Sequence, residues 1–357
     1  MVETAAIAPV RMRHLLNRKD GTARAALFGG LLAVLAASLM IAVCSGAVSL
    51  SLDEIFAALT GSGTERSTLI LWTIRLPRAL MAGLVGASLA LCGALMQGLF
   101  RNPLADPGLT GVSSGAALAA VFVIVVGQNR LGPHAVELLP IAAFLGGLAV
   151  TAALYFVSTM HGQTAVQTML LAGIAFAAIA GALTGLLIFI ANEQQLREFT
   201  FWTLGSLGGA TWQKAAIIGG VLLFTLPFWP WLARSMDKLA LGEAEAAFAG
   251  LHVEWVKAAC IIFTALLTGA CVAMSGTIGF VGLVVPHVIR LLLGPGHGRL
   301  LPSAVLLGAS LLILSDTFAR VVAAPAELPI GIVTATLGGP LFLWMLLRDR
   351  RLAGVRL

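Results

Sequence analysis

The sequence has 357 residues, of which 59% are apolar and only 11% are charged, and its mean hydropathy is +0.98. A soluble globular domain has about 25% charged residues, so this chain cannot cover its surface with water-compatible groups, and most of that surface must face lipid. The net charge of +6 does not indicate nucleic-acid binding, because the Lys and Arg residues fall mostly in short loops rather than in a basic cluster on a soluble module.

Apolar runs of roughly 20 residues predict an all-α membrane protein with about ten transmembrane helices in a single domain, residues 25–347. The expected spans are 25–45, 76–97, 112–127, 138–158, 165–191, 214–233, 254–274, 277–293, 301–322 and 330–347. The first run is longer than a signal-peptide core, so we expect an uncleaved helix. Most basic residues lie on the inner side if the tails 1–24 and 348–357 are both cytoplasmic, which predicts an N-in, C-in topology.

Three segments between the spans are predicted to be structured. Ser51 and Glu54 have the spacing of a capping box, which predicts a short amphipathic helix on the outer side. The polar and aromatic residues 192–212 predict an interfacial helix on the same side. Residues 234–252 form the longest inner loop, with helical propensity on both sides of Gly242; an ordinary solvated linker is the alternative.

The spans within residues 76–191 and within residues 254–347 form two similar sets. Each set has four helices with a short second member, and the two sets enter the membrane from opposite sides. This pattern is compatible with an inverted repeat.

Motifs for catalysis and for tight metal binding are missing from the sequence. The four cysteines lie in apolar runs without a Cys-x-x-Cys pair or a His at ligand spacing, so they are expected to be small buried apolar residues. None of the four lysines follows a glycine, as a phosphate-binding loop requires. We therefore predict no metal site, no catalytic residues and no ATPase activity in this chain.

Four stretches resemble one family in the same order along the chain: Ile74–Ala120, Gly276–Arg290, Leu314–Arg320 and Ala326–Leu346. The family is that of the FecCD-type permeases, the membrane subunits of ABC importers for vitamin B12, ferric siderophores and haem. The resemblance implies a homodimer of ten-helix protomers in the bacterial inner membrane. It also implies two cytoplasmic ATPase subunits, which bind ATP and Mg, and a periplasmic substrate-binding protein.

Arg75, Arg78 and Arg320 lie at the outer ends of predicted spans. An arginine inside the bilayer costs about 2.5 kcal/mol or more, so these side chains must reach water, lipid headgroups or a carboxylate. Interfacial snorkelling is one reading, and the family resemblance implies another, in which they receive glutamates of the binding protein. Asp316 lies four residues before Arg320, so we expect an intrahelical ion pair rather than a proton relay.

Two inner segments are candidates for gating and coupling. Two prolines and a glycine in residues 101–108 predict a rigid turn, in which Asn102 satisfies free backbone groups. Beyond that plain structural role, the family resemblance implies a cytoplasmic gate and a contact with the ATPase. The gate residues are Asn102, Leu104, Val166 and Gln167, and the coupling residues are Leu241, Gly242, Glu243 and Phe248.

Small residues in the fifth and tenth spans allow close helix packing, and the resemblance implies that these helices line the pathway at the dimer axis. Residues 192–212 are most similar to the haem-importing branch, so haem is the expected transported substrate, with a ferric siderophore or vitamin B12 as alternatives. No permanently bound cofactor is expected. An ion-coupled secondary transporter is the alternative from another class, but few carboxylates lie within the spans.

Overall fold

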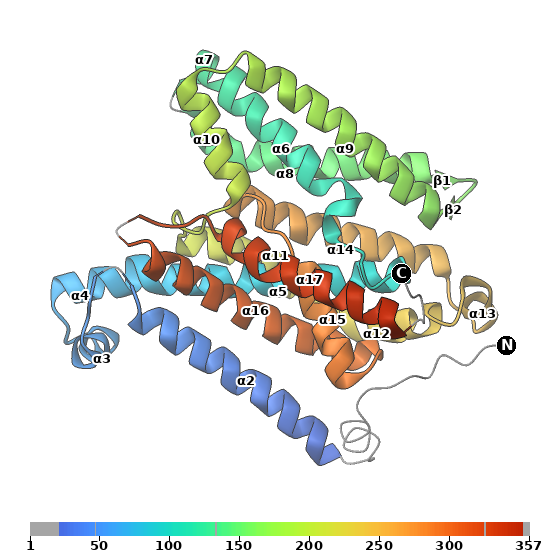
Figure 1. Ribbon diagram of the computed structural model, residues 1–357, viewed down its shortest axis with the longest axis horizontal. Coiled ribbons are helices and arrows are strands. Elements are labelled where there is room, and N and C mark those ends of the chain that lie inside the picture. The colour runs from blue at the N-terminus through green and yellow to red at the C-terminus, as the bar shows by residue number, and fades with distance from the viewer. Residues whose placement is uncertain (1–20, 47, 133, 325, 353–357) are drawn as a thin grey trace.

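The computed structural model describes residues 21–46, 48–132, 134–324 and 326–352, so the predictions for 1–20 and 353–357 lie outside the described residues. The chain forms an elongated bundle of helices (Figure 1). The helices of the first half are α2 (Gly21–Cys44), α3 (Leu52–Thr60), α4 (Glu65–Leu69), α5 (Leu76–Leu99), α6 (Val112–Phe122), α7 (Gln128–Leu131), α8 (His134–Ser158) and α9 (Val166–Phe189). Those of the second half are α10 (Glu193–Leu204), α11 (Trp212–Thr225), α12 (Trp229–Leu239), α13 (Glu243–Phe248), α14 (Val253–Ser275), α15 (Val281–Leu293), α16 (His297–Val322) and α17 (Ile330–Leu352).

The expected spans are present as helices. Eight helical segments of the described chain are long and apolar enough to cross a membrane, and the shorter apolar helices Val281–Leu293 and Ile330–Met345 supply the two remaining spans. Helix α6 has 11 residues and α15 has 13, so the second member of each predicted set is indeed short. The inverted repeat itself stays a prediction.

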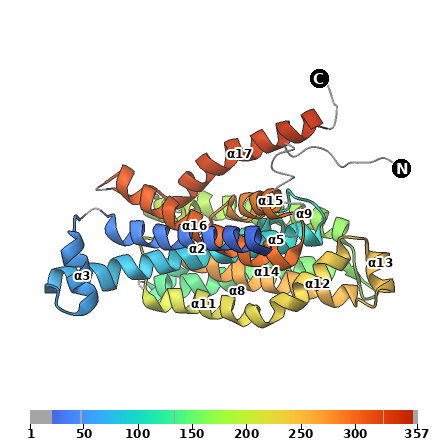
Figure 2. The ribbon, with the colours of Figure 1, turned by 90° about the horizontal axis from the view of Figure 1, so that it is seen from below.

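The two ends of the bundle carry different small elements. Helices α3 and α4 lie at one end, and α13 lies at the other, together with the beginning of α2 and the end of α17 (Figures 1 and 2). The hairpin of β1 (Thr159–Met160) and β2 (Gln163–Thr164) lies at this second end. The first end is the outer end and the second the inner end of the predicted topology, which places the start of α2 and the end of α17 on one side, as expected.

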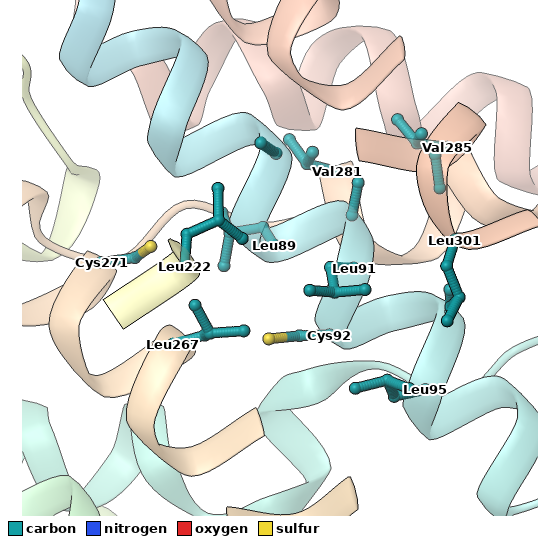
Figure 3. Close-up of a cluster of buried hydrophobic side chains, with 14 of the residues drawn as sticks. Leu89, Leu91, Cys92, Leu95, Leu222, Leu267, Cys271, Val281, Val285 and Leu301 are labelled. Carbon is teal, nitrogen blue, oxygen red and sulfur yellow. The ribbon is translucent and has the colours of Figure 1, made fainter. Parts of the chain in front are cut away.

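Helix α5 is the centre of the bundle, because it packs against α11, α14, α15 and α16. Its leucines and Cys92 interdigitate with apolar side chains of these neighbours (Figure 3). Glycines let the backbones approach: a Cβ on Gly93 would lie 1.7 Å from the carbonyl oxygen of Gly282, and one on Gly86 would lie 2.2 Å from that of Gly308. Close packing of this kind holds helices together in lipid, where hydrophobic burial gives little driving force.

The second span begins earlier than the sequence predicts. Helix runs without a break from Glu65 to Leu99, and residues Ile70–Arg75 form a π-helical segment. The amide of Leu76 donates to the carbonyl of Leu71, five residues back. Proline in a regular helix collides with a carbonyl in the preceding turn, and this wider turn accommodates Pro77. Arg75 and Arg78 therefore lie inside a continuous helix and not at its mouth.

The inner loop at 234–252 is shorter than predicted. Helix α12 continues the sixth span to Leu239, after a 3₁₀ turn at Leu226–Phe228, and α13 begins at Glu243. Helical structure does lie on both sides of Gly242, which has a φ of +135°. The segment is therefore helical at α13 rather than an irregular linker, although most of its residues are exposed to solvent.

The capping box at Ser51 and Glu54 is confirmed, since each side chain accepts the backbone N–H of the other residue. A helix is also present within 192–212, as α10, and its interfacial position stays a prediction. Of the four cysteines, Cys92, Cys260 and Cys271 are buried and Cys44 is partly buried, and all are free thiols. Among the described residues, no group of three or more His, Cys, Asp or Glu side chains could hold a metal ion.

Candidate functional site: the outer arginine cluster and the inner coupling site

The three arginines predicted for docking lie close together at the outer end, in a cluster completed by Asp316 and Glu327. We call these five residues the outer arginine cluster. Arg78 donates through Nη2 to Asp316 (2.9 Å) and through Nη1 to Glu327 (2.8 Å). Asp316 also lies 3.2 Å from Nε of Arg320, which confirms the predicted i,i+4 ion pair. This last contact is an ion pair rather than an aligned hydrogen bond, because Nε of Arg320 has no hydrogen-bond acceptor among the described residues.

Arg75 has a different role in the same cluster, because its partners are backbone carbonyls. Its guanidinium donates to the carbonyls of Val43 (2.5 Å) and Cys44 (3.2 Å), at the end of α2, and to that of Val48. The last carbonyls of a helix lack partners within the helix and carry partial negative charge. Arg75 therefore caps α2 and ties it to α5.

The cluster is largely closed to solvent. The exposed fraction is 2% for Arg75 and 6% for both Arg78 and Arg320, whereas the Glu327 side chain is 46% exposed. Snorkelling into headgroups, the alternative reading of the sequence, does not describe these buried side chains. The docking role stays a prediction, and Glu327 is the exposed member of the cluster.

The predicted gate residues lie at the inner end in two segments. Asn102 accepts the backbone N–H of Leu104 at 2.9 Å, so it satisfies a free backbone group as predicted. Asp106 accepts the N–H of Gly108 in the same turn, and burial raises the pKa of this carboxyl. Val166 and Gln167 begin α9, directly after the β1–β2 hairpin. The turn and the hairpin are thus both rigid, locally bonded elements.

The predicted coupling residues lie in and beside α13. Leu241 is 75% exposed and Phe248 is 93% exposed, so two large apolar side chains point away from the protein at the inner end. Gly242 packs against the Glu245 carboxylate, where a Cβ would lie 1.9 Å from Oε2. Glu243 differs from the others, because its carboxylate points back into the protein and pairs with Lys257.

Lys257 joins segments that the sequence gives no reason to connect. Its Nζ donates to Glu243 (2.8 Å), to Glu254 (2.9 Å) and to the carbonyl of Thr164 (2.8 Å). Glu254 in turn accepts the N–H of Thr164 at 2.8 Å, and Glu243 lies 3.7 Å from Arg101. We call these five residues the inner coupling site. From the sequence, Lys257 is predicted only to be one of the inner basic residues. Its position one turn inside an apolar span is the feature that could have indicated a buried charge with partners.

A cavity of about 1300 Å³ opens beside the inner coupling site. Its lining includes Arg101, Gln163, Val166, Gln167, Glu243 and Lys257. The structure therefore brings one pair of predicted gate residues and one predicted coupling residue around the same space. Asn102 and Leu104 follow Arg101 but are not part of the lining.

These features define a polytopic membrane protein with a buried arginine cluster at one end and a charged site beside a large cavity at the other. The sequence matches the FecCD transport family over residues 32–348. It is 46% identical to the hemin transport system permease protein HmuU of Yersinia pestis over 307 residues, which are 85% of this chain and 90% of that one. It is 41% identical to the vitamin B12 import system permease protein BtuC of Shigella boydii, over 88% of this chain and 92% of that one.

A solved structure, described as an inward-facing conformation of a metal-chelate type ABC transporter, has the same fold. It superposes with a TM-score of 0.80 and 32% identity over 90% of this chain and 99% of that one. The chain belongs to the FecCD transport family and is the multi-pass membrane permease of a bacterial ABC importer. It is therefore not itself the ATPase, and it works with ATPase and binding-protein partners. The ion-coupled carrier considered above is excluded by this membership.

Proposed function

We propose that this permease transports haem from the periplasm to the cytoplasm. The observation that carries the proposal is the 46% identity to a hemin permease across nearly its whole length. The chain is 41% identical to a vitamin B12 permease. Sequence identity therefore separates the haem and vitamin B12 permeases by only a narrow margin. The similarity of residues 192–212 to the haem branch also favours haem.

The test is uptake into proteoliposomes that contain this chain with its ATPase, supplied with the binding protein and hemin outside and ATP inside. We expect hemin to accumulate with ATP and not with ADP. Cobalamin and a ferric siderophore are the competing substrates, each tested with the same complex. Accumulation of cobalamin or the siderophore without hemin would contradict the haem assignment and leave the importer class intact.

We propose that two copies of the chain form the transport unit and that α9 and α17 face each other across the pathway. Only 11% of the 18-residue apolar window of α9 is buried within one protomer, the smallest share among the long spans of the described chain. A side chain added at Gly181 on α9 or at Gly339 on α17 would meet no described atom within 4 Å, so these positions leave room for another helix. Helix α17 also leans away from the bundle (Figure 2).

The inner end is proposed to meet the ATPase through α13, with Leu241, Gly242, Glu243 and Phe248 as the contact residues. Exposed aromatic and aliphatic side chains anchor protein interfaces when they fill a pocket of the partner, which supports this role for Phe248 and Leu241. We also assign Asn102, Leu104, Val166 and Gln167 to the cytoplasmic gate, since both segments border the inner end of α5 or α9.

The outer arginine cluster is proposed as the docking point for carboxylates of the binding protein. Arg75, Arg78 and Arg320 already have partners inside the protomer, so an incoming carboxylate must displace one of them. Glu327 is the exposed partner, and its release would free Nη1 of Arg78. A carboxylate of the binding protein could then take the same position without exposing the buried pair with Asp316.

This arrangement predicts that Glu327→Gln tightens docking. The partly exposed pair with Arg78 contributes up to about 1 kcal/mol, which corresponds to about a five-fold lower Kd for the binding protein at low salt. The measurement is binding to the permease in nanodiscs, repeated at rising salt, which should reduce the gain. Glu65→Gln is the control, an exposed carboxylate at the same end without an arginine contact among the described residues. An unchanged or higher Kd for Glu327→Gln would contradict the displacement.

A further inference from the structure

The inner coupling site connects three segments that are separate in the sequence. Glu243 is the first residue of α13, Thr164 ends the hairpin that leads into α9, and Arg101 begins the turn that contains Asn102. Lys257 on α14 bonds directly to the first two, and Glu243 bridges to the third. The segment proposed to meet the ATPase is therefore linked through two side chains to both segments proposed to form the gate.

The link to the hairpin uses both backbone groups of Thr164, its carbonyl and its N–H. Lys257 donates to the carbonyl of Thr164, and Glu254 accepts the N–H of the same residue. The Thr164 side chain contacts that of Thr159 at 3.0 Å across the hairpin, and Ala165, next in the chain, donates to the carbonyl of Ser158. The hairpin is thus held as a unit against α14, and only Ala165 separates it from the start of α9.

Burial of Lys257 makes the loss of this link costly. The Lys257 side chain is only 3% exposed, while those of Glu243 and Glu254 are 41% and 33% exposed. A buried ammonium must keep its hydrogen-bond partners, because leaving it unpaired costs far more than losing a surface contact. When Glu243 moves with α13, either Lys257 follows or a buried charge loses a partner.

We propose that Lys257 is the positioning residue that transmits displacement of α13 to the hairpin before α9, and so couples nucleotide-driven movement to the cytoplasmic gate. The inference rests on the proposed contact between α13 and the ATPase. It goes beyond that contact, because it identifies the side chain that carries the movement into the membrane domain.

Two substitutions test the role from different sides. Lys257→Met keeps the length of the side chain and removes its charge and hydrogen bonds. Glu243→Gln weakens the connections of α13 to Lys257 and to Arg101, and it leaves the bonds among Lys257, Glu254 and Thr164 in place. Lys238→Met is the matched control, since Lys238 donates to Ala249 next to α13 but is exposed and, within the described chain, does not bond to the hairpin.

The first readout is hemin uptake per ATP hydrolysed in proteoliposomes of the complete complex. Loss of a charged, buried hydrogen-bond partner is expected to lower this ratio by about tenfold in Lys257→Met, and by a smaller factor in Glu243→Gln, while ATP hydrolysis continues. Lys238→Met should keep the native ratio. A parallel loss of uptake and hydrolysis, or a native ratio in both test variants, would overturn the proposal.

The second readout does not depend on the transported substrate. Hydrogen exchange of the peptide at residues 159–167 is compared in the complex with ADP and with ATP and vanadate. We expect a nucleotide-dependent difference in the native chain that disappears in Lys257→Met and Glu243→Gln. In Glu243→Gln the exchange with ADP should remain native, because the bonds to Thr164 are intact. A full native difference in either variant, or none in the native chain, would overturn the role.

Co-purification of the ATPase with the permease distinguishes a failure of the role of Lys257 from a failure of the proposed contact through α13. Phe248→Asp should prevent the ATPase from co-purifying with the permease if α13 is the contact. Normal assembly of Phe248→Asp would contradict the proposed contact itself. Lost assembly in that variant, together with native coupling in Lys257→Met, would contradict only the role of Lys257.

Discussion

Replacing Asp316 by Asn is expected to lower the free energy of unfolding by about 3–5 kcal/mol, because breaking a buried ion pair on one side leaves uncompensated charge. Asp316 is 2% exposed and is the shared carboxylate of Arg78 and Arg320. After the substitution, Glu327 alone faces both arginines, and its direct contact is with Arg78. The measurement is denaturant unfolding of the purified permease in mild detergent, together with the amount of folded protein in the membrane.

The control for this substitution is Asp53→Asn, which removes an exposed carboxylate in the first turn of α3 at the same end of the bundle. A surface substitution of this kind changes stability by about 0.5 kcal/mol or less. Equal stabilities of the two variants would contradict the structural role of Asp316.

Gly93→Ala is expected to destabilise the bundle by about 3 kcal/mol or more, at the upper end for overpacked cores. The added methyl group would lie 1.7 Å from the carbonyl oxygen of Gly282, which belongs to the backbone of α15 and cannot rotate away. Helix α5 must then separate from α15, and the apolar contacts between the two helices are lost with it. Thermal unfolding in detergent is the measurement.

Gly220→Ala on α11 is the matched control, since no described atom lies within 4 Å of its added methyl group. Alanine is favoured over glycine inside a helix by about 1 kcal/mol, so this variant should be as stable as the native chain or more so. The test is the comparison of the two changes in stability, since Gly93→Ala should lower the stability and Gly220→Ala should leave it unchanged or raise it. Equal effects would mean that the close approach of α5 and α15 does not limit packing.

The spans and their order could be predicted from the sequence because each depends on local composition. A run of about 20 apolar residues must be helical in lipid, where every backbone polar group needs a partner within the segment. The same reasoning predicted the capping box at Ser51, the turn at Asn102 and the pairing of Asp316 with Arg320. All of these interactions join residues within four positions of each other.

The boundaries that were wrong depend on geometry that a hydropathy scan does not contain. The helix before Arg75 begins with four polar residues, and Arg75, Pro77 and Arg78 then interrupt its apolar run. Its π-helical turn makes room for Pro77. Helix α12 reaches Leu239 although its last turns carry charged residues, because its opposite face packs on α14 and α16. Packing on one face thus extended both helices beyond their apolar runs.

Local sequence was therefore sufficient for the class of protein, the ten spans and the family. The partners of its buried charges were decided only by the tertiary structure. Arg78 meets Asp316 and Glu327 across 238 and 249 positions, and Lys257 meets Thr164 across 93. Charge within an apolar run shows that a partner must exist, since an unpaired charge in the bilayer is costly. Which residue supplies that partner depends on how the helices pack, and the partner cannot be identified from composition.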